Sequence, residues 1–528
     1  MTGADLLIKA LADAGVEVCF ANPGTSEMQL VAAIDVEPRM RAILGLFEGV
    51  VTGAADGYGR MADRPALTLL HLGPGFGNGT ANLHNARRAQ SPVLNMIGDH
   101  ATYHLQYDAP LTADIHGFAA PVSDHVGDSE SPVHLATAGM TAWQAACTYP
   151  GQVASFIAPA DHAWSDAEGD TPTAPPPAVP TCDNAAVEAA ASHLRNGQNM
   201  ALFLGGRALR EDALWQAGRI AAATGARLIT ETFCARLQRG AGRVPVERLP
   251  YFGEQAADFL KDIDTLVIVG SKAPVSFFAY PGKPSFLAPE SATICTLADV
   301  RTDALDALTR LAEALGAPAE PSILQPRAAH PLEHGDMNMV ELGKVIANRL
   351  PEGAVVSDEG ATNGMGAFVF TGSAAPHDWL MLTGGAIGQG LPVAVGAAVA
   401  CPNQKVVALQ ADGGGMYTVQ SLWTMVRENL DVTVVLLNNS SYAILNIEME
   451  RVGVANPSDK ARSLLDLSNP TINWVQLAEG MGMAASRATT VAEFDASFAL
   501  AMQQTGPRLI EVILPGYQAS NPLNTGAN

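Results

Sequence analysis

The sequence predicts an α/β protein with three doubly wound parallel-sheet domains. Its 528 residues are too many for one hydrophobic core, so several domains are expected. Short runs rich in Val, Ile and Leu alternate with Gly-containing turns and helical stretches along the whole chain. Continuous apolar strands that alternate with helices are typical of parallel sheets covered on both faces.

Two proline-rich stretches separate the domains. They read "EGDTPTAPPPAVPTCD" from residue 168 to 183 and "GAPAEPSILQPRAAHPLEHGD" from residue 316 to 336. Closely spaced prolines keep a chain extended and cannot continue a helix or a central strand, so both stretches are interpreted as linker regions. The predicted domains are therefore 1–167, 184–320 and 335–528, with linkers at 168–183 and 321–334.

Each domain contains four or five apolar runs that predict its strands. The first domain has them at 16–22, 41–47, 65–72, 92–99 and 153–160. The central domain has them at 200–206, 226–231, 264–271 and 292–299, and the third at 353–359, 379–385, 405–412, 432–439 and 508–515. Parallel sheets of this kind bind ligands at the carboxyl ends of their strands.

Composition and charge argue against some classes of binding partner. The formal net charge is −22 and we find no basic run, which argues against nucleic acid. The six cysteines show no CxxC pair or zinc-like spacing, which is typical of reduced thiols in a cytosolic protein. The sequence contains no run of about 18 apolar residues, so no membrane span is expected. The start of the sequence indicates a helix and a strand rather than a signal peptide. We expect a cytoplasmic protein that acts on a small molecule.

One βαβ unit places polar residues at the ends of two strands. Asp412 ends the run 405–412, and Asn438 and Asn439 end the run 432–439. A right-handed crossover makes these strands neighbours or near neighbours, so Asp412 and Asn439 are expected to converge. Carboxylate and amide oxygens suit Mg²⁺, which commonly takes further oxygens from a phosphate.

Three glycines follow Asp412 and open the next helix. Gly413, Gly414 and Gly415 carry no side chains that would block a ligand, and free N–H groups at a helix start suit phosphate oxygens. Taken alone, the glycines also fit a tight strand-to-helix turn. Together with the two asparagines on the next strand, they predict a diphosphate and metal site.

This segment resembles the diphosphate-binding signature of thiamine-diphosphate (ThDP) enzymes, which is Gly-Asp-Gly, a helix and strand, then Asn-Asn. Ala411 replaces the first Gly, and we expect only a slight adjustment of the turn. In the first domain, Glu48 followed by Ala55-Asp56-Gly57-Tyr58 resembles the family pattern around the cofactor-activating acid. A lone Glu at a helix start also has an ordinary role as a dipole partner. The resemblance implies ThDP and Mg²⁺ as cofactors and Glu48 as the carboxyl group at ring nitrogen N1′ of ThDP.

The same resemblance implies further contacts in the third domain. The carbonyl of Gly385 would accept a hydrogen bond from the cofactor amine, and Ile387 would be the apolar wedge that bends the cofactor, although ordinary core packing also explains an Ile. The remaining implied contacts are Thr362, Gly413 and Gly414 on the diphosphate, Ser441 on the metal through its backbone oxygen, and Ile444 and Leu445 on the aminopyrimidine and substrate pocket. A homodimer or homotetramer is also implied, with Glu48 and Asp412 of one site on different chains.

On the substrate side, the chain resembles benzoylformate decarboxylase. Thr25 in "NPGTSEMQL" would face the substrate carboxylate, although Thr25 or Ser26 would equally serve as a helix N-cap. His71 matches a catalytic histidine and would transfer protons, whereas a lone His is more often structural. His100 is a second candidate, and His84 is interpreted as a helix-surface residue. Pro74 lacks an N–H donor, which argues against a dinucleotide loop at residues 73–77.

The sequence departs from each of two related families at one position. The central-domain stretch "APVSFFAYPGKPS" has no counterpart of the second histidine of benzoylformate decarboxylase. Asn446 and Ile447 stand where acetohydroxyacid synthases carry a Gln-Trp pair that holds the acceptor. Those synthases also carry FAD in the central domain, but no glycine loop here is specific enough to predict FAD.

Stretches along essentially the whole chain closely resemble those of acetohydroxyacid (acetolactate) synthase-like large subunits, namely "FANPGTSE", "LFEGV", "LHLGPG", "GDHATYH", "PVSFFAYPG" and "TGGAIG". We therefore expect a ThDP- and Mg²⁺-dependent enzyme that decarboxylates a 2-oxo acid such as pyruvate and passes the resulting enamine to a carbonyl acceptor. The alternatives are a benzoylformate-type decarboxylase without ligation, a non-catalytic ThDP-binding regulatory homologue and a nucleotide-binding α/β protein. The sequence leaves the substrate, the acceptor and the choice between dimer and tetramer open.

Overall fold

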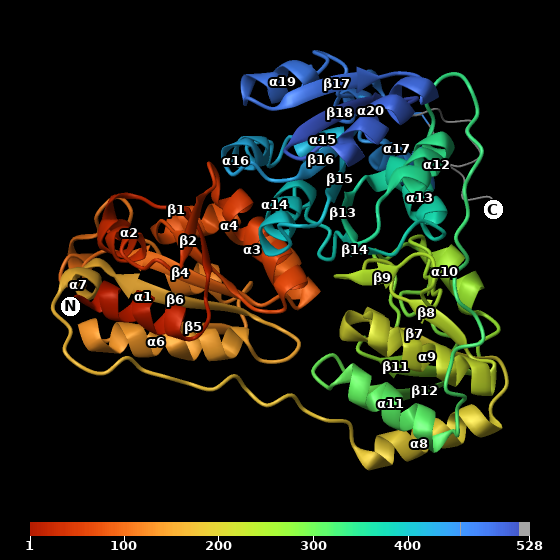
Figure 1. Ribbon diagram of the computed structural model, residues 1–528, viewed down its shortest axis with the longest axis horizontal. Coiled ribbons are helices and arrows are strands. Elements are labelled where there is room, and N and C mark those ends of the chain that lie inside the picture. Colours follow the sequence, from red (N-terminus) through yellow and green to blue (C-terminus); the bar gives the residue numbers. More distant parts are fainter. Residues whose placement is uncertain (455, 517–528) are drawn as a thin grey trace.

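The computed structural model describes residues 1–454 and 456–516, and it contains three predominantly parallel sheets (Figure 1). Every strand predicted from the sequence is present, with bounds shifted by a few residues. The chain passes from the first sheet to the central one through the extended segment that contains the first proline-rich stretch. A second extended segment connects the central sheet to the third.

The first sheet has six strands in the order β2-β1-β3-β4-β6-β5. The strands are β1 (Val18–Asn22), β2 (Arg41–Leu44), β3 (Ala66–Leu70), β4 (Val93–Asp99), β5 (His125–Asp128) and β6 (Val153–Pro159). The helical elements are α1 (Gly3–Asp13), η1 (Thr25–Glu27), α2 (Met28–Asp35), α3 (Glu48–Ala62), α4 (Leu72–Ala89), η2 (Leu105–Tyr107), α5 (Ile115–Ala119), α6 (Pro132–Ala146) and α7 (Ala160–Trp164). Helices α1, α6 and α7 pack together, and α3 packs against α4.

The central sheet has five strands in the order β10-β8-β7-β11-β12. They are β7 (Met200–Leu204), β8 (Arg227–Thr230), β10 (Glu247–Arg248), β11 (Thr265–Val269) and β12 (Thr293–Ala298). The helical elements are α8 (Asn184–Asn196), η3 (Gly206–Leu209), α9 (Glu211–Thr224), α10 (Gly253–Leu260) and α11 (Ala304–Ala314).

The third sheet has seven strands in the order β17-β18-β16-β15-β13-β14-β9. They are β9 (Leu237–Arg239), β13 (Ala354–Glu359), β14 (His377–Met381), β15 (Val406–Ala411), β16 (Val432–Asn438), β17 (Ala484–Ala488) and β18 (Arg508–Ile513). The helices are α12 (Met339–Arg349), α13 (Ala361–Thr371), α14 (Gly390–Ala400), α15 (Asp412–Gly415), α16 (Ser421–Arg427), α17 (Ala443–Arg451), α18 (Asp459–Ser463), α19 (Trp474–Gly480) and α20 (Val491–Gln503). Strands β15 and β16 pair directly, as the crossover argument requires.

Some elements differ from the sequence prediction. The single helix expected after Asp412 is broken into α15 and α16, because residues 416–420 form turns between them. Strands β5, β9, β10 and β17 were not predicted, since they are short and lack an apolar run. Strand β9 comes from the central part of the chain, yet it pairs antiparallel with β14 at the edge of the third sheet.

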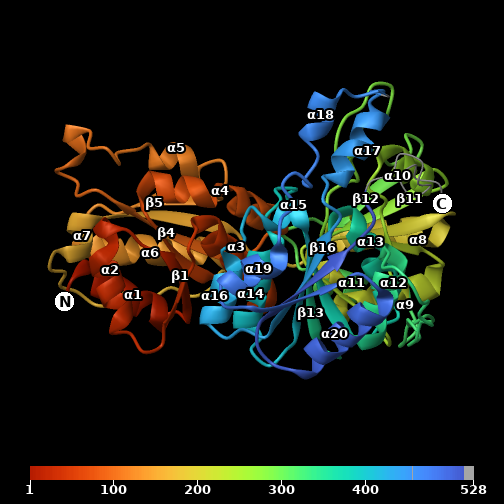
Figure 2. The same ribbon diagram turned by 90° about the horizontal axis from the view of Figure 1, so that it is seen from above.

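Helices α3 and α14 join the first and third domains (Figure 2). Glycines make this contact close: a Cβ at Gly57 would lie 2.1 Å from the carbonyl oxygen of Val393, and one at Gly396 would lie 1.9 Å from that of Ala54. The two ligand-binding sheet edges are thus held by backbone-to-backbone packing. Within residues 1–454 and 456–516, we find no helix with the length and apolar character of a membrane span.

Candidate functional site

Glu48 forms the centre of the first-domain half of the site. It is the first residue of α3, directly beyond β2, and only 7% of its surface is exposed. Its Oε2 accepts a hydrogen bond of 3.0 Å from Asn78 Nδ2 of α4. A Cβ at Gly75 would lie 3.0 Å from Glu48 Oε1, so a glycine there lets α4 approach the carboxyl group closely. Sequence reasoning missed Asn78, although its place near the start of α4 at a ligand-binding edge was a usable signal.

His71 is held by a buried carboxylate. Its Nδ1 lies 2.8 Å from Oε2 of Glu27, a residue with no exposed surface. Glu27 also accepts hydrogen bonds from the Gly24 amide at 2.7 Å and from Ser26 Oγ at 2.9 Å. With Nδ1–H donated to Glu27, the tautomer inferred from these contacts leaves the Nε2 lone pair for a substrate. Sequence reasoning missed this role of Glu27.

The N-cap alternative for Thr25 and Ser26 is wrong. Neither hydroxyl caps η1 or α2, and Glu27 satisfies the Gly24 amide instead. Thr25 is exposed and precedes Ser26 and Glu27, which both contact His71. Its hydroxyl is therefore accessible to a ligand.

Two other histidines have clear environments. The prediction that His84 is a helix-surface residue is also wrong, because it is half-buried and its Nε2 lies 3.1 Å from the carbonyl oxygen of Gly384. The ring of His100 lies near that of His104, with centroids 5.3 Å apart and the ring planes tilted by 60°. Its buried Nε2 has no hydrogen-bond partner among the described residues.

The Asp412 and Asn439 backbones converge at the edge of the third sheet. Asp412 Oδ2 accepts the Ser440 amide at 2.8 Å, and Oδ1 accepts the Gly413 amide at 2.9 Å. Burial raises the pKa of Asp412 to about 6. Asn439 Oδ1 accepts the Ser441 amide at 3.1 Å. Asn438 Nδ2 donates to Glu511 Oε1 at 2.7 Å, and Asn438 Oδ1 accepts the Ser440 amide at 3.0 Å, so Asn438 connects the sheet to the same turn.

The chemistry of these residues fits a cation that carries a phosphate ligand. In the described part of the chain, no three His, Cys, Asp or Glu side chains gather in a metal-binding group. Asp412 therefore needs amide, backbone and ligand oxygens as companions, which is the set that Mg²⁺ accepts. Thr362 Oγ1 is buried without a hydrogen-bond partner in the described structure and suits a phosphate oxygen. Ala411 has φ −70° and ψ 146°, a conformation open to any residue, so replacing Gly there causes no strain.

A buried acid shapes the loop that contains Gly385 and Ile387. Glu359, at the end of β13, accepts the amides of Gly388 at 2.7 Å and Gly390 at 2.5 Å. Burial raises the pKa of Glu359. Gly385 and Gly388 have φ values of +77° and +94°, which favour glycine. Ile387 is half-buried. The sequence missed Glu359, although it ends a strand at the ligand-binding edge.

Helix α4 of the first domain contacts both the start of α3 and the loop that contains Ile387 in the same chain. Asn82 Nδ2 donates to the carbonyl oxygen of Gly49 at 2.8 Å and to that of Gly388 at 3.3 Å. Asn85 Nδ2 donates to the Ala386 carbonyl at 2.7 Å, and its Oδ1 accepts the Ala386 amide at 3.2 Å. The residue after Glu48 and the residue after Ile387 are therefore bridged by a single side chain. The placement of Glu48 and Asp412 of one site on different subunits stays a prediction.

The central-domain stretch that lacks a histidine contributes instead to a cluster of aromatic rings around Phe277. A Cβ at Gly385 would lie 2.8 Å from the ring of Phe277. That ring contacts Phe278, Tyr251 and Phe233, with centroids 4.9, 5.5 and 5.7 Å away.

The same loop is fastened to the third domain. Tyr280 Oη donates to Glu448 Oε2 of α17 at 2.6 Å, and Arg451 pairs with Glu254 at 2.5 Å. Helix α17 also carries Ile444, which is half-buried, and Leu445, which is exposed. Residues of the central domain therefore contact the helix that was expected to border the substrate pocket.

These features define a class of protein in which a diphosphate-bearing cofactor binds between the edges of two parallel sheets. Residues 1–125 match the model "Thiamine pyrophosphate enzyme, N-terminal TPP binding domain", and residues 359–512 match "Thiamine pyrophosphate enzyme, C-terminal TPP binding domain". The chain belongs to the thiamine pyrophosphate enzyme family, thiamine pyrophosphate being another name for ThDP.

Individual relatives agree with this family. The chain is 50% identical over 516 residues to the "Putative acetolactate synthase large subunit IlvX" of Mycobacterium tuberculosis, covering 98% of this chain and 99% of that protein. It is 25% identical to a benzoylformate decarboxylase of Pseudomonas aeruginosa, covering 94% and 96%. The solved structure of a ThDP-dependent 4-hydroxybenzoylformate decarboxylase from Rhodococcus jostii RHA1 shares the fold, with a TM-score of 0.86, 21% identity and coverage of 98% and 100%.

Proposed function

We propose that the protein is a ThDP- and Mg²⁺-dependent enzyme that decarboxylates a 2-oxo acid and joins the remaining fragment to a second carbonyl compound, as an acetolactate-synthase-type carboligase. The similarity to IlvX over nearly the whole chain supports the carboligase class. The single observation that carries the catalytic part is Glu48 itself, which is buried at the start of α3 with its carboxyl group hydrogen-bonded by Asn78.

When bound, ThDP supplies the carbanion that adds to the keto carbon and accepts the electrons released with CO₂. The protein's residues supply the placement. Glu48 exchanges a proton with ring nitrogen N1′, and Asn78 keeps its carboxyl group in position. Asp412, Asn439 and the Ser441 carbonyl hold Mg²⁺, while Thr362, Gly413 and Gly414 contact the diphosphate. The Gly385 carbonyl accepts a hydrogen bond from the cofactor amine, Ile387 bends the cofactor, and Ile444 and Leu445 border the aminopyrimidine and the substrate pocket.

Phe277 and Phe278 are 42% and 54% exposed in the single chain, and they would exclude water from the substrate side once a substrate or a second subunit covers them. A dry pocket protects the reactive intermediate from protonation by solvent, which favours ligation over simple decarboxylation. Because Asn446 and Ile447 replace the Gln-Trp pair, we propose that the acceptor differs from that of the acetohydroxyacid synthases that carry that pair.

A second candidate function is favoured by one observation. The Glu27–His71 pair, with Thr25 exposed nearby, provides a histidine whose Nε2 can first accept a proton and then deliver it to an intermediate. In that case the protein is a benzoylformate-type decarboxylase that releases an aldehyde without ligation. A non-catalytic regulatory homologue would have no need for the buried Glu48–Asn78 contact.

We further propose a cytoplasmic homodimer or homotetramer with the active site at the subunit interface. FAD is not proposed as a cofactor. The absorbance of the purified protein near the flavin bands tests that view directly, because bound FAD would give it a yellow colour.

The decisive experiment measures CO₂ release from pyruvate, 2-oxobutyrate and benzoylformate by the purified protein with ThDP and Mg²⁺. Glu48→Gln keeps the shape of the side chain but cannot share a proton in the same way, so we expect activity to fall by about 10²-fold or more. Identification of the product separates a hydroxyketo acid from an aldehyde. Wild-type protein that binds ThDP tightly but releases no CO₂ from any 2-oxo acid would support the regulatory alternative instead.

A further inference from the structure

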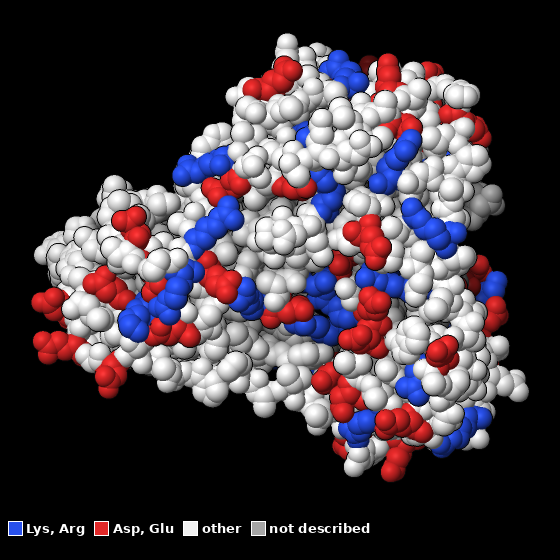
Figure 3. All heavy atoms as spheres, in the orientation of Figure 1, with Lys and Arg blue, Asp and Glu red and all other residues white. Residues whose placement is uncertain are grey.

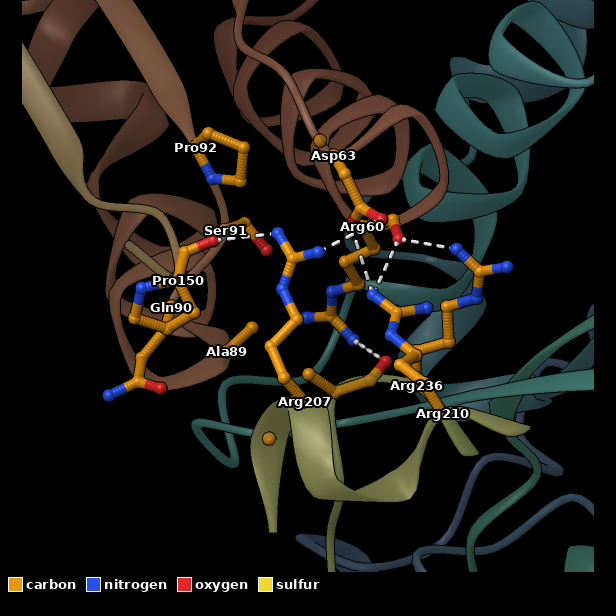
Figure 4. A pocket seen from close by; sticks show the side chains of 13 residues that line it. Arg60, Asp63, Ala89, Gln90, Ser91, Pro92, Pro150, Arg207, Arg210 and Arg236 are labelled. Atoms are coloured by element: carbon orange, nitrogen blue, oxygen red, sulfur yellow. Dashed lines mark hydrogen bonds and ion pairs between the residues drawn. The ribbon is translucent and has the colours of Figure 1, made fainter. Parts of the chain in front are cut away.

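A hollow lies between the first and central domains, beside the last turn of α3 (Figure 4). Its empty volume is about 340 Å³, including the part open to solvent. Four arginines line it: Arg60 from α3, Arg207 and Arg210 from the segment that follows β7, and Arg236 from the segment that follows β8. Figure 3 shows that acidic and basic side chains gather near the middle of this face of the molecule.

Two of the arginines are neutralised by carboxylates outside the hollow. Arg60 forms a two-pronged pair with the buried Asp56, at 2.8 and 2.6 Å, and also donates to the Met381 carbonyl at 2.7 Å. Arg236 donates to Asp378 Oδ1 at 2.5 Å. Neither residue has charge left for a ligand, and both are structural.

The other two arginines share one acid. Arg207 Nη1 lies 3.0 Å from Asp63 Oδ2, and Arg210 Nη2 lies 3.1 Å from Asp63 Oδ1. Within this group of three, two positive charges face one negative charge, so one positive charge is uncompensated. In a partly desolvated hollow such a charge favours a bound anion.

Arg210 has N–H groups available for that anion. Its Nε and Nη1 are buried, and neither has a hydrogen-bond acceptor within the described ranges 1–454 and 456–516. Burial, followed by the nearby charge of Arg236, lowers the pKa of Arg210 to about 9, so the side chain is still cationic at neutral pH. A buried guanidinium with unpaired N–H groups is costly unless a partner supplies acceptor oxygens.

We propose that this hollow is a binding site for a small phosphate-type oxyanion, held by Arg210 and Arg207. A tetrahedral oxyanion supplies several acceptor oxygens and the missing negative charge together. Arg210 Nη2 also donates to the Arg60 carbonyl at the end of α3, so the bound anion would tighten the junction between the first and central domains. Glu48 lies at the opposite end of α3, roughly 20 Å away along a helix of this length. The site is therefore separate from the cofactor site.

The test is isothermal titration of the full-length protein, saturated with ThDP and Mg²⁺, with inorganic phosphate. Acetate and chloride at equal ionic strength serve as reference anions. We expect phosphate to bind with a measurable heat and to raise the melting temperature, while the reference anions do neither. Arg210→Gln should weaken phosphate binding about tenfold or more, because it removes a charge-assisted contact. Arg88→Gln, an exposed arginine of α4 with no contact to the hollow, should leave binding unchanged.

Two results would overturn the proposal: equal binding of acetate and phosphate, or equal phosphate binding by the wild type and Arg210→Gln. If Arg210→Gln does not fold, Arg207→Gln removes the second proposed contact and should also weaken binding. Selenate soaked into crystals of the wild-type protein gives an independent measurement. An anomalous peak beside Arg210 supports the site, and a peak only elsewhere excludes it. None of these results depends on whether the protein releases CO₂.

Discussion

Several single polar residues at or shortly after strand ends are buried in this protein. Glu27, Glu359 and Asp412 are each at most 4% exposed, and each accepts at least two hydrogen bonds from backbone amides or side chains. Buried carboxyl groups with this many donors hold loops in fixed positions. Glu27 thereby positions His71, and Glu359 positions the loop of Ile387.

Thr362 permits a test of the diphosphate contact. Thr362→Val removes a buried hydroxyl that has no partner in the described structure, so the unliganded protein should keep or slightly raise its melting temperature. Its affinity for ThDP should fall about 2- to 10-fold, since one hydrogen bond is lost. Thr362→Ser keeps the hydroxyl and should bind ThDP like the wild type. Unchanged affinity in Thr362→Val would remove Thr362 from the cofactor site.

The buried His377 is expected to make the free energy of unfolding sensitive to acid. It is fully buried, and burial lowers its pKa from the ordinary 6.5 to about 3. Between these two pH values the unfolded chain binds a proton that the folded chain does not, so the free energy of unfolding should decrease as the pH falls from about 6.5 towards 3. His377→Gln should show a shallower decrease in urea unfolding at several pH values. The exposed His334→Gln serves as the control and should follow the wild type.

At the scale of elements, the helix pair α3 and α14 explains why the two sheet edges keep a fixed relation. Glycines at the contact let backbone meet backbone, and larger residues would separate the helices. The apolar strands β15 and β16 are buried between helical layers, which fixes Asp412 relative to Asn439. A shift of α3 would move Glu48 away from its partners, because Glu48 is the first residue of that helix.

Gly57→Ala should therefore destabilise the protein. The new Cβ would lie 2.1 Å from the Val393 carbonyl oxygen, and such overpacking typically costs about 1–3 kcal/mol. Gly77→Ala in α4 is the matched control, because a Cβ at that position meets nothing within 4 Å. There the higher helix propensity of Ala should be neutral or stabilise by up to about 1 kcal/mol. Equal melting temperatures for the two variants would contradict the close α3–α14 contact.

At the scale of the whole molecule, three domains contribute to one region. Glu48 and His71 belong to the first domain, Asp412 and the Ile387 loop belong to the third, and Phe277 of the central domain lies against Gly385 of that loop. Arg60 further connects the domains, because it also donates to the Ala235 carbonyl at 3.2 Å. A working site takes its halves either from one chain or, as we propose, from two.

Co-expression of two inactive variants separates these possibilities. Mixed oligomers of Glu48→Gln and Asp412→Asn should regain activity if the halves come from different subunits, because one site in each mixed dimer then contains both wild-type residues. If each site is built within one chain, every site carries one substitution and the mixture stays inactive. We expect recovery of up to about half of the activity per mixed dimer, measured as CO₂ release after purification with two different tags.

Much of the fold could be predicted from the sequence, because buried parallel strands leave long apolar runs and the glycine and asparagine motifs lie at their ends. The short strands β9 and β10 could not be predicted, since their pairing depends on distant segments. Local spacing also gave no sign that Glu27 would bond to His71, that His84 would reach Gly384, or that Asn82 would bridge two domains. Each of these contacts joins residues far apart in the chain.

The sequence by itself determined the parallel sheets, the order of the elements and the residues that end the strands, because local hydrophobic pattern and turn chemistry encode these directly. The tertiary structure alone decided which of those strand ends face one another and which carboxyl groups are satisfied. It also decided that Arg210 would be left with unpaired N–H groups among the described residues. The physical reason is that such contacts depend on the packing of domains, and packing depends on side chains that no local pattern brings together.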